Sequence, residues 1–434
     1  MKQCDLLLYT TKYRKGGSKF KRAAETKFNQ IRKKNREVFC KAVESKKEFL
    51  EAFQNLKDQG YTVQNFYFYG HSGMYGIMFG TKDWPEQFSP YEWKNMSLPV
   101  DSETKMYFYA CRSGRWFAPF IARTLGVTAY GYHNYTTVSL APRNFLWEGF
   151  GDKLCPMFII ACPGKKSHGM LASILKYLGF AKIEKISRYL PESKKVDTTY
   201  DKVSHLYEST FEDIQVRSDE LVWLENKLKT IQPEKVLDIG CGNGSFLDKL
   251  SGHFSQGVGV DLSKGMLEQA KIKRGHNQKL SFKNIDGPSL PFEDNSFDVV
   301  MSTLAFRYLD WDPVMSEILR VLKPGGRFLV LDMVTAPVKA TDMGLFVKSK
   351  LKHYQQRKSF PQYYEALRKL VTNPAWKKML HYNPIRSEHE MKWYLESRFE
   401  GNKAEVINVG WKSRILAFDT GRVDSKQVEK LSYP

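Results

Sequence analysis

The run of residues 236–244 constrains the fold of this chain more than any other segment. Apolar residues surround Asp238 in this run, and Gly240, Gly242 and Gly244 follow at alternate positions. Glycines at this spacing let the backbone turn sharply and leave room for a ligand to lie against bare amide groups. The segment therefore predicts a buried strand, a ligand-binding turn and a helix that begins near residue 245, which is the repeating unit of an α/β sheet.

The residues around these glycines distinguish between two classes of ligand. The G-x-G-x-x-G pattern of nicotinamide-binding sites requires glycine at position 245, where this chain has Ser245. The carboxylate of Asp238, just before the first glycine, disfavours a pyrophosphate and favours a cationic or amine-bearing ligand. The pattern therefore favours S-adenosylmethionine, whose sulfonium and amino groups are positive, over a dinucleotide.

The same run resembles motif I of the class I methyltransferases, which use S-adenosylmethionine as their cofactor. The resemblance assigns Asp238, Gly240, Cys241, Gly242 and Gly244 to the cofactor-binding loop. It implies a Rossmann-like, seven-stranded sheet over residues 200–434, with a helical lid at about 336–402.

The segments that follow agree with this resemblance. Residues 257–261 predict a second buried strand that ends in Asp261, where a carboxylate can bond both ribose hydroxyls of the cofactor. The resemblance adds Leu262 to this site. It also places Asp286 and Gly287, in the loop after the third strand, beside the adenine amine.

The rest of the sheet can be followed to the end of the chain. Residues 297–304 predict a fourth strand, and the end of that strand, near Ser302, faces the methyl donor in the family. A helix and a Pro-Gly-Gly turn lead to a fifth strand at 328–331. Residues 404–409 and 413–418 predict two more strands, of which we expect the last to be antiparallel and at the edge of the sheet.

The sequence narrows the class of methyl acceptor without naming it. The place where enzymes that methylate exocyclic base amines carry an Asn/Asp-Pro-Pro-aromatic motif holds Ser302-Thr303-Leu304-Ala305 here. The segment as a whole is most similar to quinone-biosynthesis and general small-molecule methyltransferases. The predicted lid is rich in aromatic residues, which suit a flat or apolar acceptor, although such rings also serve to pack lid helices on the sheet. An RNA acceptor, or a regulatory protein that only senses the cofactor, remains an alternative.

Residues 1–165 have a strand–helix rhythm of their own. Predicted strands alternate with helices, as in an α/β sheet of parallel strands, at residues 5–9, 37–43, 65–69, 105–110 and 127–131. His71 follows the third of these strands and Cys111 the fourth. Carboxyl ends of neighbouring parallel strands are where α/β folds place their sites, so a His–Cys pair is expected there.

The chemistry of Cys111 is compatible with a nucleophile. We expect it to begin a helix, whose N-terminal dipole favours a thiolate, with Arg112 and Arg115 adding positive charge. Residues 109–114 and 69–73 resemble the cysteine and histidine motifs of metacaspases, and so the caspase-like fold of clan CD cysteine peptidases. The resemblance implies a His71–Cys111 dyad and a peptide substrate. The pair departs from the family in having Ser72 directly after the histidine, and an inactive caspase-like scaffold is the alternative.

A serine hydrolase is a weaker interpretation of the same segment. Residues 70–74 nearly match G-x-S-x-G, but the last position is Met74, and no suitable Asp and His follow in order.

Length and composition bound the whole molecule. At 434 residues, with 42% hydrophobic residues, two domains are expected, joined by a helical linker at 166–199. No apolar run is long enough to cross a membrane, and the six cysteines form no metal-binding pattern, so we expect reduced thiols, no metal and a cytoplasmic location. About half of the +20 net charge lies in the first fifty residues, which indicates either a nucleic-acid surface or a solvated helix face.

Overall fold

The computed structural model describes most of the chain in two compact units. The described residues are 2–73, 75–138, 157–160, 184–192, 200–211, 214–336, 338, 340–383 and 385–424. The first unit spans Met1–Lys195 and the second spans Val196–Pro434.

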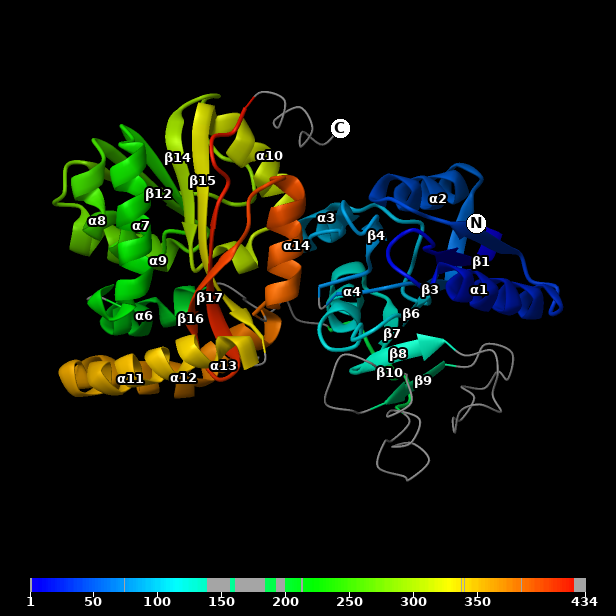
Figure 1. The fold of residues 1–434 in the computed structure, drawn as a ribbon. Helices are drawn as coiled ribbons and strands as arrows, with labels where there is room; N and C mark the ends of the chain where they lie inside the picture. The colour runs from blue at the N-terminus through cyan, green and yellow to red at the C-terminus, as the bar shows by residue number, and fades with distance from the viewer. Residues whose placement is uncertain are drawn as a thin grey trace. The chain divides into compact units, whose positions relative to one another are not determined.

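The first unit contains a six-stranded sheet in the order β10-β7-β6-β3-β1-β2 (Figure 1). Five of these strands are parallel to one another, and β10 pairs antiparallel with β7. The strands are β1 (Lys2–Tyr9), β2 (Val38–Ala42), β3 (Tyr61–Tyr69), β6 (Lys105–Tyr109), β7 (Thr128–Gly131) and β10 (Ser187–Tyr189). Two hairpins lie outside this sheet: β4 (Phe79–Gly80) with β5 (Pro85–Glu86), and β8 (Tyr135–Val138) with β9 (Met157–Ile160).

Alternation along the strands explains how helices cover both faces of this sheet. Phe66 and Phe68 of β3 pack in one core, whereas Tyr67 and Tyr69 pack in the other, because successive strand side chains point to opposite faces. The first core takes residues from α2 (Lys46–Asp58), α3 (Pro90–Asn95) and α4 (Phe117–Leu125), and the second takes residues from α1 (Gly17–Arg32).

Two expectations for this unit are wrong. The helix α4 begins at Phe117, six residues beyond Cys111, so Cys111 does not begin a helix and no helix dipole acts on its thiol. The end of the predicted linker helix is a strand, since residues 187–189 form β10 on the sheet. Residues 166–183 and 193–199 of the predicted linker lie outside the described part of the chain.

The second unit contains a seven-stranded sheet in the order β13-β12-β11-β14-β15-β17-β16. The strands are β11 (Lys235–Ile239), β12 (Gln256–Asp261), β13 (Leu280–Asn284), β14 (Phe297–Thr303), β15 (Leu322–Thr335), β16 (Glu405–Val409) and β17 (Ser413–Asp419). The first five are parallel, and β17 runs antiparallel to both of its neighbours. The last strand is antiparallel as expected but lies inside the sheet, so the predicted edge position is wrong and β16 is the edge strand.

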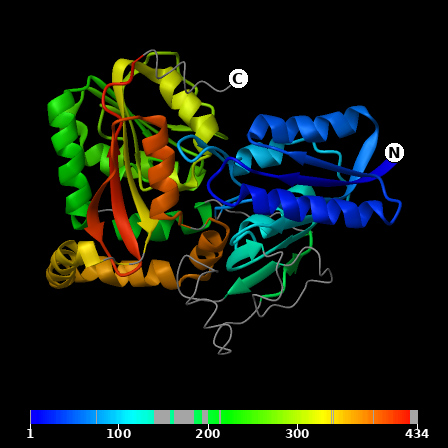
Figure 2. The same cartoon turned by 45° about the vertical axis from the view of Figure 1, so that its right-hand side comes forward.

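Helices flank this sheet and extend beyond one end of it (Figures 1 and 2). They are α6 (Ser204–Phe211), α7 (Ser218–Ile231), α8 (Ser245–Lys249), α9 (Lys264–Arg274), α10 (Trp311–Val321), α11 (Met343–Ser359), α12 (Pro361–Thr372), α13 (Pro374–Tyr382) and α14 (Glu388–Arg398). Leu224 and Leu228 of α7 share a core with Val236, Val299 and other inward residues of the central strands.

The segment predicted as a lid divides into two parts. The helices α11, α12 and α13 lie one after another beyond the end of the sheet, where α12 packs on α6. The helix α14 instead lies along β15 and β17, as Figure 2 shows, so it belongs to the covering layer of the sheet rather than to a lid. Among the described residues, no helix combines the length and hydropathy that a membrane crossing requires.

Candidate active site

The glycine-rich loop follows β11 and takes the conformation that its sequence requires. Gly240, Gly242 and Gly244 have φ angles of 75°, 55° and 75°, in the left-handed region that other residues rarely adopt. A side chain at Gly240 would also collide with Ala305, because an added Cβ would lie 2.4 Å from its Cβ. Backbone conformation and close packing therefore both demand glycine at this turn.

Asp238 lies near the end of β11, where the backbone N–H of Thr303 favours its charged form but no basic side chain in the described part of the protein pairs with it. Its side chain is 1% exposed, and Oδ1 is buried without a hydrogen-bond partner. Burial, with a smaller contribution from the charge of Asp261, raises the pKa of Asp238 to about 8. A buried carboxyl group with an unsatisfied oxygen is costly, and a cationic ligand would offset that cost.

Asp261, at the end of β12, is held by backbone amides on both of its oxygens. The N–H of Gly242 donates to Oδ2 and the N–H of Ser263 donates to Oδ1, each at 2.8 Å. Burial raises the pKa of Asp261, whereas these two amides and the N–H of Leu262 favour its ionised form, whose remaining lone pairs can accept the hydroxyls of a ribose. The site predicted from the sequence therefore comes together here, since Gly242 and Asp261 are in direct contact.

The other predicted cofactor residues make less specific contacts. Leu262 is 52% exposed, so its apolar side chain is free to cover a base. Asp286 is exposed and Gly287 half-buried in the loop after β13. Burial, with the charges of Asp261 and Asp238, raises the pKa of the Cys241 thiol well above its usual value, so Cys241 stays neutral beside the loop.

The structure gives Ser302 a different place from the one expected. Its side chain is fully buried inside the sheet, and its hydroxyl donates to the carbonyl oxygen of Ile239 at 2.9 Å. That bond ties β14 to β11, so Ser302 supports the loop rather than facing a ligand.

A buried ion pair that the sequence did not reveal lies near the ends of β14 and β15. Arg307 is 7% exposed and Asp332 is fully buried, and the guanidinium bonds the carboxylate. The backbone N–H of Arg307 also donates to Asp332 Oδ2 at 2.5 Å, and the guanidinium lies 4.5 Å from the ring centroid of Tyr308. The pair therefore positions Tyr308. An acid inside the otherwise apolar stretch of β15 is the sequence signal that could have revealed it.

Aromatic rings from four separate segments gather beside the acids. Tyr200 is in ring contact with Tyr207 of α6 at 5.9 Å, with Tyr308 at 6.1 Å and with Trp376 of α13 at 5.8 Å. All four residues are partly exposed, so ring surface is available to a ligand. The cluster adjoins Asp261 through the neighbour of Tyr200, because Asp201 accepts the hydroxyl of Ser263 at 2.5 Å and the backbone N–H of Ser263 donates to Asp261.

The residues present fit S-adenosylmethionine. The buried, unpartnered oxygen of Asp238 suits the positive groups of the cofactor, and Asp261 retains acceptor positions for the ribose. The left-handed glycines provide backbone against which the ligand can lie, with no side chains between. Among the described residues, no group of three or more His, Cys, Asp or Glu side chains is arranged to hold a metal ion.

The sheet order and these residues define the class of the second unit, and comparison with known proteins agrees. Residues 237–330 match the family described as "Methyltransferase domain". The second unit therefore carries a class I S-adenosylmethionine-dependent methyltransferase domain, and S-adenosylmethionine is the methyl donor of that class.

The names of individual relatives are more specific than the description of the family. The demethylmenaquinone methyltransferase of Clavibacter sepedonicus is 32% identical over 161 residues, which are 36% of this chain and 65% of that protein. That of Staphylococcus haemolyticus is 28% identical over 218 residues, which are 48% of this chain and 80% of that protein. A solved S-adenosylmethionine-dependent methyltransferase from Mesorhizobium loti shares 30% identity over 26% of this chain and 56% of its own, with a TM-score of 0.23. The chain thus spans less than two thirds of the length of the Clavibacter protein.

The His71–Cys111 pair of the first unit is only partly assembled. The strands β3 and β6 are neighbours, and the hydroxyl of Ser72 bonds the carbonyl oxygen of Cys111, so the two loops touch. His71 Nε2 lies 3.0 Å from the carbonyl oxygen of Lys15, and Cys111 Sγ accepts the N–H of Thr136 at 3.3 Å. The contacts described for His71 do not include the thiol of Cys111.

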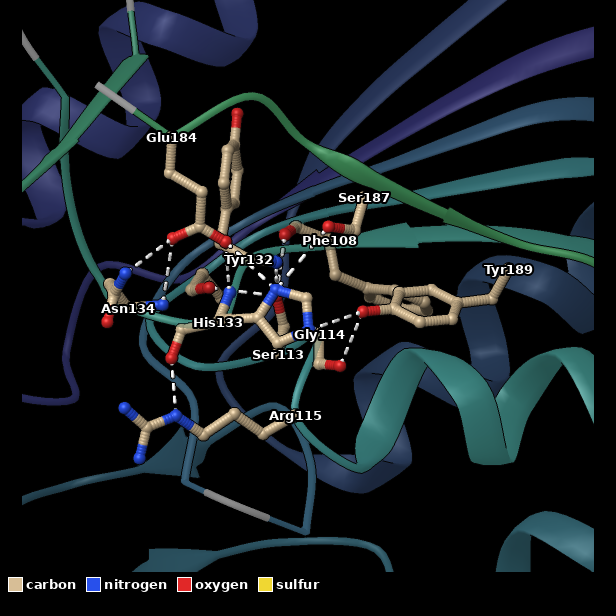
Figure 3. Close-up of polar contacts among 11 residues, drawn as sticks. Phe108, Ser113, Gly114, Arg115, Tyr132, His133, Asn134, Glu184, Ser187 and Tyr189 are labelled. Atoms are coloured by element: carbon tan, nitrogen blue, oxygen red, sulfur yellow. Dashed lines mark hydrogen bonds and ion pairs between the residues drawn. The ribbon is translucent and has the colours of Figure 1, made fainter. Parts of the chain in front are cut away.

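Figure 3 shows a polar cluster at the same edge of this sheet that the sequence did not reveal. His133 Nδ1 lies 3.1 Å from Glu184 Oε1, and Nε2 lies 3.1 Å from the hydroxyl of Tyr189, which donates to the carbonyl oxygen of Gly114 at 2.7 Å. Glu184 also accepts the backbone N–H groups of His133 and Asn134. The cluster fastens the segment of β10 to the sheet, and no local sequence signal joins residues about fifty positions apart.

Proposed function

We propose that this protein transfers a methyl group from S-adenosylmethionine to a small, flat aromatic acceptor of the quinol or phenol class. The observation that carries the proposal is the junction of Asp261, through Ser263 and Asp201, with the aromatic cluster Tyr200, Tyr207, Tyr308 and Trp376, because a donor site and rings suited to an acceptor then adjoin. The names of the relatives add support, since demethylmenaquinone carries a quinone ring.

The chain's own residues would act mainly by binding and alignment. Bound S-adenosylmethionine supplies an electrophilic methyl group, which an acceptor attacks in line. Asp238 would hold the positive end of the cofactor, and Asp261 would hold its ribose. The ring of Tyr308, positioned by the buried pair Arg307–Asp332, would help orient the acceptor, and correct orientation supplies much of the rate gain in such displacements.

The cofactor assignment is tested by Asp261→Ala. Removing the carboxylate deletes its ribose bonds and also leaves the N–H groups of Gly242 and Ser263 without their acceptor. We expect S-adenosylmethionine to bind about tenfold more weakly or worse by isothermal titration calorimetry, since hydrogen bonds to a charged group are worth about 1.5–3 kcal/mol each. Glu268→Ala, at an exposed position of α9, is the matched control and should bind as the wild type does. Equal affinity in both variants would exclude Asp261 from the site.

A second candidate activity, cysteine peptidase chemistry at Cys111, rests on one specific observation. The loops that carry the two residues touch, since the hydroxyl of Ser72, next to His71, bonds the carbonyl oxygen of Cys111, and Cys111 Sγ accepts the backbone N–H of Thr136. Burial lowers the pKa of His71, so its ring is neutral at pH 7 and able to accept a proton.

This second proposal is tested by alkylating Cys111 with iodoacetamide at pH 7 and following the modified residue by mass spectrometry. An assembled dyad predicts that His71→Ala slows alkylation of Cys111 while leaving that of the half-buried Cys40 unchanged. Equal rates in the wild type and the variant would leave Cys111 without a base and remove the peptidase proposal.

A further inference from the structure

The helix α11 (Met343–Ser359) packs against the rest of the second unit through polar residues. Lys352 forms an ion pair with Asp219 at 2.5 Å, and the side-chain amide of Gln356 donates to the carbonyl oxygen of Val216 at 2.8 Å. Not one residue of α11 is buried. A surface helix usually turns its apolar side to the core, so this arrangement is the reverse of the ordinary one.

The apolar residues of α11 form a stripe that faces outward. Met343, Val347, Leu351 and Tyr354 follow one another at intervals of four, four and three residues, which places them on one side of the helix. Their exposed fractions are 50%, 50%, 62% and 61%. We call these four residues the apolar stripe, and its length of about 16 Å is too short to cross a bilayer.

A tryptophan extends this apolar surface onto the neighbouring hairpin. Trp411, in the turn between β16 and β17, is 67% exposed, and its ring centroid lies 5.9 Å from that of Phe346 in α11. An exposed tryptophan beside an exposed apolar stripe is typical of protein surfaces that sit at the boundary between lipid and water.

Basic side chains accompany the stripe. The helix contains Lys348, Lys350, Arg357 and Lys358 besides the paired Lys352, and it contains no acid. The ammonium of Lys358 lies 4.7 Å from the ring centroid of Tyr354, so positive charge stands directly beside the stripe. A helix with exposed apolar residues and only positive charges matches an anionic membrane surface in both respects.

We propose that α11 and Trp411 form an interfacial docking surface for a membrane that contains anionic lipids. A second copy of this chain is a poorer occupant, because a symmetric contact would bring the lysines of both helices together. The proposal goes beyond the methyl-transfer function and does not depend on it. It also suits that function, since α11 adjoins α12, α12 adjoins α13, and α13 contributes Trp376 to the aromatic cluster.

The test is co-sedimentation of the full-length protein with phosphatidylcholine vesicles, with and without phosphatidylglycerol. We expect binding to the anionic vesicles that weakens as salt is added, and little binding to the neutral ones. Val347→Glu and Leu351→Glu should each lower the partition coefficient roughly tenfold or more, because each places a charge where an apolar side chain would enter the interface. Ile272→Glu, at a 73% exposed position of α9, makes the same change of charge elsewhere and should bind as the wild type does.

Two further measurements keep the outcomes distinct. Binding of S-adenosylmethionine should be unchanged in all three variants, so a failure to bind vesicles is not a failure of the methyltransferase site. Light scattering after gel filtration reports the oligomeric state. Absence of vesicle binding at low salt, equal binding by Leu351→Glu and wild type, or a dimer that the stripe variants dissociate would each overturn the proposal.

Discussion

At the scale of single residues, the unusual protonation of Asp238 is the feature with the clearest consequence. A carboxyl group whose pKa is about 8 is mostly neutral at pH 7 in the ligand-free protein. A positive ligand beside it favours the ionised form, so binding should expel the proton. Asp238, the acid of the motif, is therefore protonated in the ligand-free protein and should lose its proton when the cofactor binds.

This proton release is measurable. Titrating S-adenosylmethionine into the protein at pH 7, in buffers of different ionisation enthalpy, should show a proton released on binding, and affinity should rise from pH 6 to pH 7. Asp238→Asn should abolish the release and weaken binding, because the amide cannot take up a negative charge. A wild type whose binding enthalpy is independent of the buffer would contradict the assignment.

The raised pKa of Asp238 also determines whether the free energy of unfolding rises or falls with pH. The pKa of Asp238 is 3.8 in its ordinary state and about 8 in the folded protein, so the folded state binds more protons than the unfolded chain between these values. The ligand-free protein therefore loses stability as pH rises through this range. Asp238→Asn removes that loss, and urea unfolding of the ligand-free variant at pH 8 and pH 5 should show a smaller difference than the wild type does.

At the scale of elements, the parallel strands were predictable and the irregular ones were not. Each of β11, β12 and β14 is a short apolar run next to a glycine or an acid, and local pattern is sufficient for such strands. The order of the last two strands depends on which edge backbone remains open, and no local pattern records that. For this reason β17 was expected at the edge of the sheet, although it lies between β15 and β16.

The turn after β6 shows a second limit of local pattern. Gly114 approaches Gly131 so closely that a Cβ added to Gly114 would lie 2.8 Å from the carbonyl carbon of Gly131. That contact holds residues 111–116 in turns, and Arg112 takes a φ of 58° there. A helix was expected to begin at Cys111, whereas α4 begins at Phe117. The local sequence could not predict this delay, because the contact that causes it involves Gly131 of β7.

The candidate site, like the fold, could be predicted from the sequence only where its residues are close together in the chain. Asp238, Asp261 and the glycines belong to one continuous pattern, and the structure joins them through the bond from Gly242 to Asp261. The aromatic cluster was expected only as a general property of the lid. Its members Tyr200, Tyr308 and Trp376 lie far apart in the chain, so only the fold brings them into contact.

At the scale of the whole molecule, each unit has a core built from its own residues, and every residue assigned to the cofactor lies in the second unit. A ligand that binds the folded form of one unit stabilises that unit, by about 2.7 kcal/mol when its concentration is a hundred times the dissociation constant. We therefore expect two transitions in scanning calorimetry of the full chain, only one of which moves when S-adenosylmethionine is added. For a unit of this size the shift should be about 5–10 °C.

The variant Asp261→Ala identifies the transition that moves. In that variant a tenfold loss of affinity leaves the same cofactor concentration at about ten times the dissociation constant, so the stabilisation falls to about 1.4 kcal/mol and the transition of the second unit should shift about half as far or less, while both cores remain intact. An equal upward shift of both transitions in the wild type would contradict independent units, since it requires that the free energy of cofactor binding also stabilise residues 1–195. The calorimetric result therefore decides whether the first unit can respond to the cofactor, which the regulatory alternative requires and methyl transfer does not.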